Sequence, residues 1–108
     1  MKQYYVYILE CSDQLLYTGI TNDINRRIVE HNSGLNKGCF TYKRRPVTFK
    51  FYQNFNDVNQ AIYFEKKIKK WSAQKKRSLI HGNFDLLKFL SQYRNATHYT
   101  YRPGKGDY

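Results

Sequence analysis

Five side chains in the sequence have the chemistry of a catalyst. Two phenols, Tyr7 and Tyr17, lie on successive strand-like segments, and Arg27 and His31 follow at i and i+4 of a helical segment, so that they share one face. Glu65 lies on a second helical segment. Phenols, imidazoles and carboxylates transfer protons, and a planar guanidinium suits phosphate oxygens. The set indicates a catalyst more than a scaffold.

Glu65 is the most informative of the five when the residues are considered alone. Helical spacing from Asn56 onward places it in the middle of an apolar stripe formed by Val58, Ala61, Ile62 and Ile68. A buried carboxylate needs a cation, because an uncompensated charge is costly away from water. The partner is either a lysine or arginine, or a divalent metal whose shell is completed by waters and a substrate phosphate.

The other four residues each have a plain structural interpretation. Tyrosines in strands usually pack the ring and expose the hydroxyl, and the chain has 11 of them. A phenol titrates near pH 10, about three units above neutral, so a basic role for Tyr7 or Tyr17 needs positive charge nearby. Arg27 could supply that charge, although an arginine and a histidine on a basic helix are more often simply solvated.

Several segments together resemble the GIY-YIG nuclease superfamily, in particular its small stand-alone bacterial members. The resemblance covers roughly residues 3–90 and is carried by Tyr5-Val6-Tyr7, Tyr17-Thr18-Gly19, Arg27, His31, Thr41 to Val47 and Ala61 to Trp71. Two positions depart from the family pattern. Tyr5 stands where the motif has its first glycine, and Ile20 stands where some relatives have a lysine.

The resemblance implies a role for each of the five residues. The family's metal-binding glutamate falls on Glu65, which would hold Mg²⁺ or Mn²⁺ as a Lewis acid. Arg27 would stabilise the charge that develops at phosphorus, and Tyr17 or Tyr7, helped by His31, would handle the proton. We expect all five side chains to converge on one pocket.

The charge balance predicts a polyanionic partner. The chain of 108 residues has 19 Lys and Arg against 8 Asp and Glu, a net charge of +11. We expect contacts to nucleic acid, with DNA favoured over RNA, from Gly19, Lys43, Arg44, Arg45, Lys66, Lys69 and Lys70. No apolar run is long enough to span a membrane and no secretory signal is evident, so we expect a cytoplasmic protein with no membrane partner.

The elements that must position these residues form an α/β domain of the α+β type. We expect a three-stranded antiparallel sheet, with strands over residues 4–10 and 15–19 and a third that begins near Val47 and buries Val47, Phe49 and Phe51 on one face. Cap residues predict helices that open at Thr21-Asn22-Asp23, at Asn56-Asp57 and at Ser72, and a last short helix is expected from Asn83. Residues 1–90 would form the catalytic domain, and residues 91–108 a Tyr-rich basic tail.

The leading hypothesis is a metal-dependent endonuclease that hydrolyses phosphodiester bonds in DNA during repair, recombination or processing. The alternative is a DNA- or RNA-binding module that uses the same basic surface without catalysis. A pure binder has no use for Glu65, which favours the enzyme.

Overall fold

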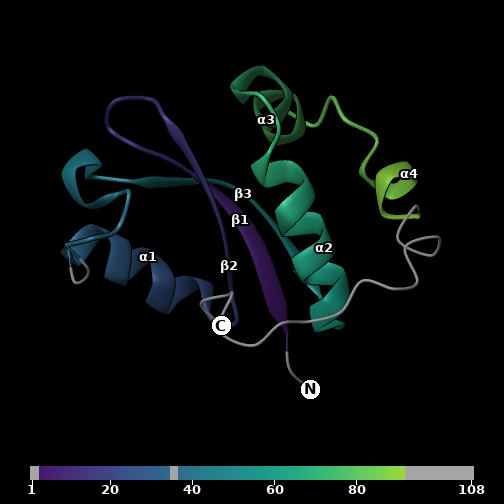
Figure 1. The fold of residues 1–108 in the computed structure, drawn as a ribbon, viewed down its shortest axis with the longest axis horizontal. Helices are drawn as coiled ribbons and strands as arrows, with labels where there is room; N and C mark the ends of the chain where they lie inside the picture. The colour runs from purple at the N-terminus through teal and green to yellow at the C-terminus, as the bar shows by residue number, and fades with distance from the viewer. Residues whose placement is uncertain (1–2, 35–36, 92–108) are drawn as a thin grey trace.

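The computed structural model describes residues 3–34 and 37–91. The elements follow in the order β1 (Tyr4–Glu10), β2 (Leu16–Thr21), α1 (Ile24–Ser33), the 3-10 turn η1 (Tyr42–Arg44), β3 (Thr48–Phe55), α2 (Val58–Lys69), α3 (Ala73–Ile80) and α4 (Leu86–Ser91) (Figure 1). The strands form one antiparallel sheet in the order β2-β1-β3. The predicted fold class is therefore confirmed. Apart from Ser91, the predicted tail lies outside the described residues.

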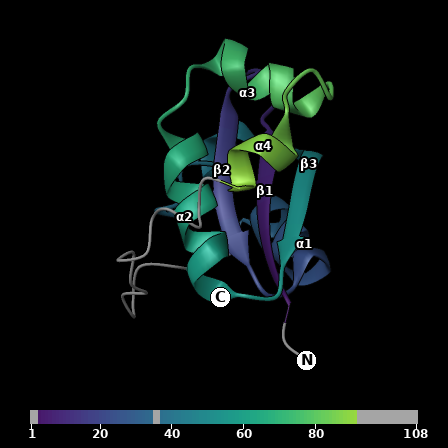
Figure 2. The ribbon, with the colours of Figure 1, turned by 90° about the vertical axis from the view of Figure 1, so that its right-hand side faces the viewer.

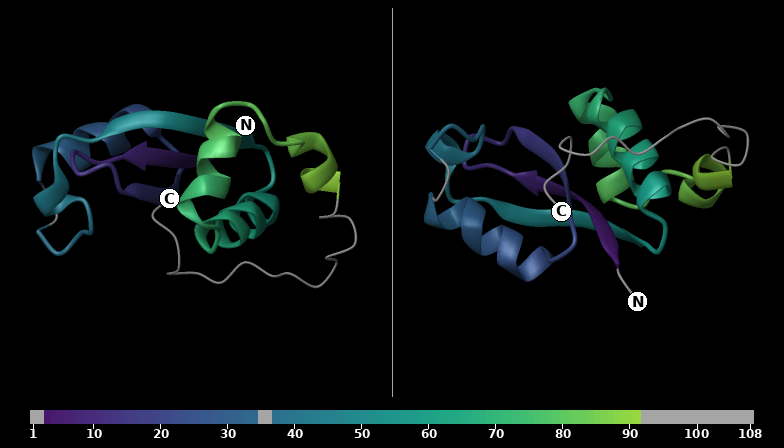
Figure 3. Two further views of the ribbon diagram at one scale, coloured as in Figure 1. Left: turned by 90° about the horizontal axis from the view of Figure 1, so that it is seen from above. Right: turned by 60° about the horizontal axis from the view of Figure 1, so that its bottom comes forward.

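The central strand β1 is covered on both faces, as its apolar alternation predicted. Val6 and Ile8 point to one side and Tyr7 and Leu9 to the other, and all four are 0% exposed. Val6 and Ile8 pack against apolar side chains of α2, α3 and α4, whereas Tyr7 and Leu9 pack on the side of α1. Figure 2 shows α2 and α4 in front of the sheet and α1 behind it. The sheet is thus the middle layer, as the right-hand view of Figure 3 also shows.

The helices begin at the predicted cap residues. Asp23 accepts a hydrogen bond from the Arg26 amide, Asp57 accepts one from Asn59, and Ser72 accepts one from Lys75. Each cap satisfies an amide that has no partner within its helix. None of the helices in the described residues is both long enough and apolar enough to span a membrane.

The prediction that Val47, Phe49 and Phe51 lie on one face of the third strand is wrong. Phe49 pairs with Leu9 while Phe51 pairs with the neighbouring Ile8, so Lys50 is an extra residue in β3. A bulge of this kind breaks the two-residue alternation. As a result, Phe49 packs beside Tyr7 and Phe51 packs in the core on the opposite face.

Candidate active site

Two strands and one helix bring four of the five predicted residues together. In the β1–β2 ladder Tyr7 pairs with Gly19, and Tyr17 pairs with Leu9, so both phenols lie on the face that α1 covers. Arg27 and His31 lie one turn apart on α1 above that face. Their i, i+4 spacing therefore directs both side chains toward the rings of the hairpin.

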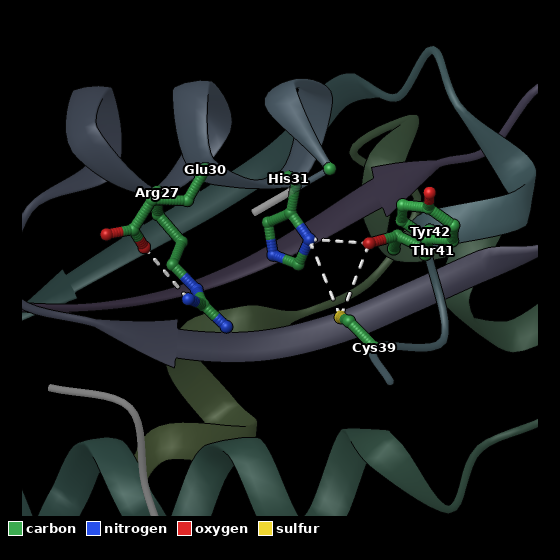
Figure 4. Close-up of a pocket in the computed structure, with 7 residues that line it drawn as sticks. Arg27, Glu30, His31, Cys39, Thr41 and Tyr42 are labelled. Carbon is green, nitrogen blue, oxygen red and sulfur yellow. Dashed lines mark hydrogen bonds and ion pairs between the residues drawn. The ribbon is translucent and has the colours of Figure 1, made fainter. Parts of the chain in front are cut away.

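The hydroxyl of Tyr7 is the meeting point of this cluster. Arg27 Nε donates to it at 3.2 Å, and Nε2 of His31 lies 3.1 Å away. The Tyr7 side chain is fully buried and His31 is 5% exposed, so these hydrogen bonds replace water. A second nitrogen of the guanidinium donates to Glu30 Oε1 at 2.9 Å, which fixes the plane of Arg27 (Figure 4).

Tyr17 lies nearer the surface of the same cluster. Its ring centroid is 5.2 Å from that of His31 and 6.4 Å from that of Tyr7. Phe40 stacks on Tyr17 at 5.9 Å and is itself 43% exposed. Tyr17 thus packs its ring against His31, Tyr7 and Phe40 and is half-buried, in contrast to the fully buried Tyr7.

Gly19 has a local role that the sequence left open. Strand β2 continues to Thr21, so Gly19 lies inside the strand rather than at its end. A Cβ there would lie 2.5 Å from Cζ of Tyr7. The position must be glycine because the Tyr7 ring crosses it, and this requirement does not depend on a ligand.

A pocket of about 230 Å³ opens beside these side chains. Its lining consists of Arg27, Glu30, His31, Gly34, Cys39, Thr41 and Tyr42, all drawn in Figure 4. The sequence analysis singled out only Arg27 and His31 from this set. Glu30 was detectable from its spacing of three residues after Arg27. Cys39 and Thr41 lie in an irregular segment, where no periodicity indicates which side chains point inward.

Glu65 lies apart from the Tyr7 cluster. It lies on α2, which packs against the opposite face of the sheet, and it is 9% exposed. Within the part of the chain that the structure describes, its carboxylate has no hydrogen bond or ion pair to Tyr7, Tyr17, Arg27 or His31. Glu65 is therefore not in direct contact with the other four side chains, and the convergence of all five on one pocket stays a prediction.

The surroundings of Glu65 are basic. Lys69 Nζ lies 3.5 Å from its carboxylate, so the lysine partner considered in the sequence analysis is present. Desolvation raises the pKa of Glu65, while the charges of Lys69, Lys66 and Lys76 oppose that shift. Among the described residues, no three His, Cys, Asp or Glu side chains are grouped to hold a metal ion. Any bound metal would therefore rely on few protein ligands.

The predicted basic contacts fall into two groups. Near the pocket, Arg44 bridges to Asp13 at 3.0 Å, and Arg45 donates to the carbonyl of Tyr42 at 2.8 Å, while Lys43 is exposed. The second group lines an open depression on α2 beside Glu65 and consists of Lys66, Lys69 and Lys70. Arg44 and Arg45 thus stabilise their own loop, whereas Lys69 and Lys70 on α2 are exposed and Lys66 is half-buried.

The family model of the GIY-YIG catalytic domain matches residues 3–78. The chain belongs to the GIY-YIG family. Membership confirms the resemblance drawn from the tyrosine, arginine and histidine spacing, and it indicates nuclease-type chemistry on a nucleic acid.

Relatives of this GIY-YIG domain include proteins of similar length. A UPF0213 protein of Syntrophus aciditrophicus (strain SB) is 43% identical over 83 residues, which are 77% of this chain and 95% of the relative. The UPF0213 protein SSP2268 of Staphylococcus saprophyticus is 42% identical over 81 residues, 74% of this chain and 96% of the relative. Neither name states an activity.

Two solution NMR structures resemble the GIY-YIG fold seen here. The UPF0213 protein BH0048 from Bacillus halodurans is 35% identical, with a TM-score of 0.50 over 83% of this chain and 95% of that one. The protein EF2693 from E. faecalis is 29% identical, with a TM-score of 0.53 over 94% and 97% of the two chains. These structures support the α+β architecture.

Proposed function

We propose that this protein is a divalent-metal-dependent endonuclease that hydrolyses phosphodiester bonds in DNA. The observation that carries the proposal is the convergence of Arg27 and His31 on the buried hydroxyl of Tyr7, beside an open pocket. A phenol hydroxyl can both donate and accept, so the kind of partner matters more than the number. A permanent cation and a titratable base, as seen at Tyr7, are the partners that a proton-transferring phenol uses.

Tyr7 is the proton-handling phenol in this proposal. Its proton passes to Nε2 of His31, and Arg27 stabilises the negative charge that remains on the phenol oxygen. The phenolate then takes a proton from a water whose oxygen attacks phosphorus in line, while the bond from phosphorus to the leaving oxygen breaks. The leaving oxygen takes a proton from solvent and the imidazolium returns its proton to solvent, so Tyr7 and His31 regain their starting states. Tyr17 is the alternative base, through its ring contact with His31.

Arg27 has a second role at the phosphate. Its side chain is 17% exposed and extends from α1 toward β2, and the guanidinium lines the pocket (Figure 4). A fixed guanidinium that is already oriented by Glu30 stabilises the extra charge on a transferring phosphoryl group without reorganisation. This pre-organisation favours the transition state over the ground state.

Glu65 is the residue that would hold Mg²⁺ or Mn²⁺. Its carboxylate is desolvated, and its one ion pair in the described residues is to Lys69, whose side chain is 62% exposed and therefore free to move away. Magnesium is often bound through one or two carboxylates together with waters and substrate phosphates, so a single glutamate fits the ion. The ion would supply Lewis-acid polarisation of a phosphate oxygen.

DNA and a cytoplasmic location belong to the proposal as well. The net charge of +11 and the exposed lysines of α2 support a polyanionic substrate that is recognised through its backbone. The family match supports a nucleic acid, and we propose DNA, in repair, recombination or processing, on the precedent of nuclease chemistry.

The test is a nicking assay with the purified full chain and Mg²⁺ on duplex, nicked, branched and single-stranded substrates. Tyr7→Phe and Arg27→Gln should each lower the nicking rate by about 10²- to 10⁴-fold. Glu65→Gln should abolish Mg²⁺-dependent nicking. Tyr52→Phe is the matched control, because Tyr52 is 58% exposed and lies outside the cluster.

Two results would contradict the proposal. Undiminished nicking by Glu65→Gln would remove Glu65 from the catalytic site. Salt-sensitive binding by the wild-type protein, with no product on any substrate in the presence of Mg²⁺ or Mn²⁺, would instead support the non-catalytic DNA- or RNA-binding module.

A further inference from the structure

Thr41 makes a buried hydrogen bond that none of the roles above uses. Its Oγ1 lies 2.7 Å from Nδ1 of His31 (Figure 4), whereas Tyr7 contacts the other nitrogen, Nε2. Thr41 is 1% exposed and His31 is 5% exposed, so water does not compete for this contact. The two nitrogens of the imidazole are therefore both engaged, one by a phenol and one by an aliphatic hydroxyl.

The chemistry of the partners gives this chain of hydrogen bonds a direction. Arg27 Nε is only a donor, so it occupies a lone pair of the Tyr7 oxygen. A protonated phenol is a stronger donor than an imidazole N–H, and an imidazole nitrogen is a stronger acceptor than a phenol oxygen, so Tyr7 donates to Nε2. The proton of neutral His31 then lies on Nδ1 and is donated to Thr41.

Cys39 lies next to Thr41 in this chain of hydrogen bonds. Its free thiol is half-buried, and Sγ lies 3.4 Å from Thr41 Oγ1 and 3.9 Å from Nδ1 of His31. Either the thiol or the threonine hydroxyl can donate in the contact between them, and in both cases a lone pair of Thr41 Oγ1 stays available to the imidazole.

We propose that Thr41 is a positioning residue that holds His31 in the tautomer protonated on Nδ1. This inference rests on the proposed function, in which Nε2 of His31 takes the proton from Tyr7. The imidazole must present an unprotonated Nε2 to do so, and it must remain stabilised once Nε2 is protonated. A hydroxyl that accepts from Nδ1 meets both needs, because it selects the tautomer first and then accepts from the imidazolium.

The effect on the reaction follows from the tautomer. Without an acceptor at Nδ1, His31 gains the alternative tautomer, in which Nε2 carries the hydrogen and donates to Tyr7. In that state the phenol has no base to receive its proton. Loss of the Thr41 hydroxyl should therefore lower kcat, by about 10- to 100-fold on the scale of outer-shell partners that orient a histidine, while KM changes little.

The closing experiment measures the tautomer directly. The imidazole nitrogen NMR shifts of His31 are recorded for the full chain without nucleic acid or metal, in the wild-type protein, Thr41→Val and Thr41→Ser. We expect the Nδ1–H tautomer in the wild-type protein, its loss in Thr41→Val, and its return in Thr41→Ser together with kcat. His31→Gln identifies the signals against those of His81 and His98.

Thr18→Val is the matched control for removing a buried threonine hydroxyl. Thr18 is 3% exposed, and among the described residues its Oγ1 has no hydrogen-bond partner. This variant should leave the His31 signals and kcat unchanged. Wild-type His31 signals in Thr41→Val, or a kcat loss that Thr41→Ser does not restore, would overturn the inference.

The spectrum also separates the two proposals. A wild-type protein that cleaves nothing contradicts the proposed function, whereas the tautomer of His31 still tests the role of Thr41.

Discussion

Gly19 lies directly opposite Tyr7 in the β1–β2 ladder, and a Cβ at position 19 would lie 2.5 Å from Cζ of the Tyr7 ring. The ring lies across the backbone of β2, and that path brings its hydroxyl to Arg27 and His31. The glycine of the segment Tyr17-Thr18-Gly19 is thus required by the last tyrosine of the segment Tyr5-Val6-Tyr7. The two segments form one structural unit, because the missing side chain of Gly19 on β2 leaves room for the Tyr7 ring from β1.

Gly19→Ala should therefore reduce nicking activity more than the small size of the added methyl group suggests. The added methyl group must displace the Tyr7 ring, which costs about 1–3 kcal/mol of stability as overpacking and moves the hydroxyl away from His31. We expect a lower unfolding midpoint in urea and a large loss of nicking at temperatures where the variant remains folded.

Gly82→Ala is the control for the stability loss. Gly82 has a φ of +77°, and nothing lies within 4 Å of a Cβ built there, so alanine strains the backbone without touching the site. The left-handed conformation costs about 1–2 kcal/mol for a residue with a Cβ. Full nicking by Gly82→Ala and weak nicking by Gly19→Ala at equal stability is the expected result. Equal activity of the two variants would show that the Tyr7 position is not critical.

Local signals explain why much of the fold was predictable. Ser72 and the segments Thr21-Asn22-Asp23 and Asn56-Asp57 were identified as caps from residue type, because capping depends on amides within three residues. The structure places the caps of the two segments at Asp23 and Asp57. The i, i+4 spacing likewise predicted that Arg27 and His31 share one face of α1, whereas their meeting with the hairpin tyrosines was implied by the family resemblance. Interactions within one turn or one hairpin are encoded by adjacent residues, so the sequence shows them directly.

Longer-range features were not predictable in the same way. The extra residue Lys50 in β3 turns Phe51 to the opposite face from Phe49, and it is defined only by pairing with a distant strand. Thr41 approaches His31 through an irregular segment without periodicity. Glu65 was correctly predicted to be buried, but the face of the sheet against which its helix packs depends on tertiary packing.

Arg77 connects α3 to the β1–β2 hairpin, and this connection should depend on pH. One nitrogen donates to Glu10 Oε2 at 2.9 Å and another to the Gln14 carbonyl at 2.8 Å. The hydrogen bond from Arg77 is the main cause that lowers the pKa of Glu10 below 4.5. The resulting stability is present above pH 4.5 and is lost as the pH falls through the lower pKa of the folded state.

Arg77→Gln should therefore lower Tm at neutral pH and flatten the decline of Tm on acidification. Arg26→Gln is the control, because its ion pair with Glu30 is 3.7 Å long and the Arg26 side chain is 48% exposed. Thermal unfolding followed by circular dichroism over an acid pH series gives the change of Tm with pH for each protein. Parallel curves for the wild-type protein and Arg77→Gln would contradict the connection.

Glu65 should make the protein less stable as the pH rises. Desolvation raises the pKa of Glu65 in the folded state above the 4.5 of the unfolded state. At a pH between the unfolded and the folded pKa, the folded chain therefore holds a proton that the unfolded chain has lost. The free energy of unfolding therefore falls across that window. Glu65→Gln cannot ionise and should be more stable than the wild-type protein at neutral pH.

Urea unfolding at a series of pH values tests this prediction. The difference between Glu65→Gln and the wild-type protein should shrink toward zero below pH 4.5, where the carboxyl is protonated in both states. A variant that is less stable than the wild-type protein at neutral pH would mean that the ion pair with Lys69 outweighs desolvation.

Nucleic-acid binding should depend on salt through the lysines of α2. Lys66 and Lys70 line the depression beside Glu65, and each phosphate contact releases a counterion. The double variant Lys66→Gln/Lys70→Gln should reduce the slope of log K against log salt by about 2, measured by fluorescence anisotropy with duplex DNA in EDTA. Lys50→Gln is the control, because Glu10 lies 3.7 Å from the Lys50 ammonium and already offsets its charge. An unchanged slope in the double variant would show that Lys66 and Lys70 do not contact the DNA. Lys43, near the pocket, would then be the next predicted contact to test.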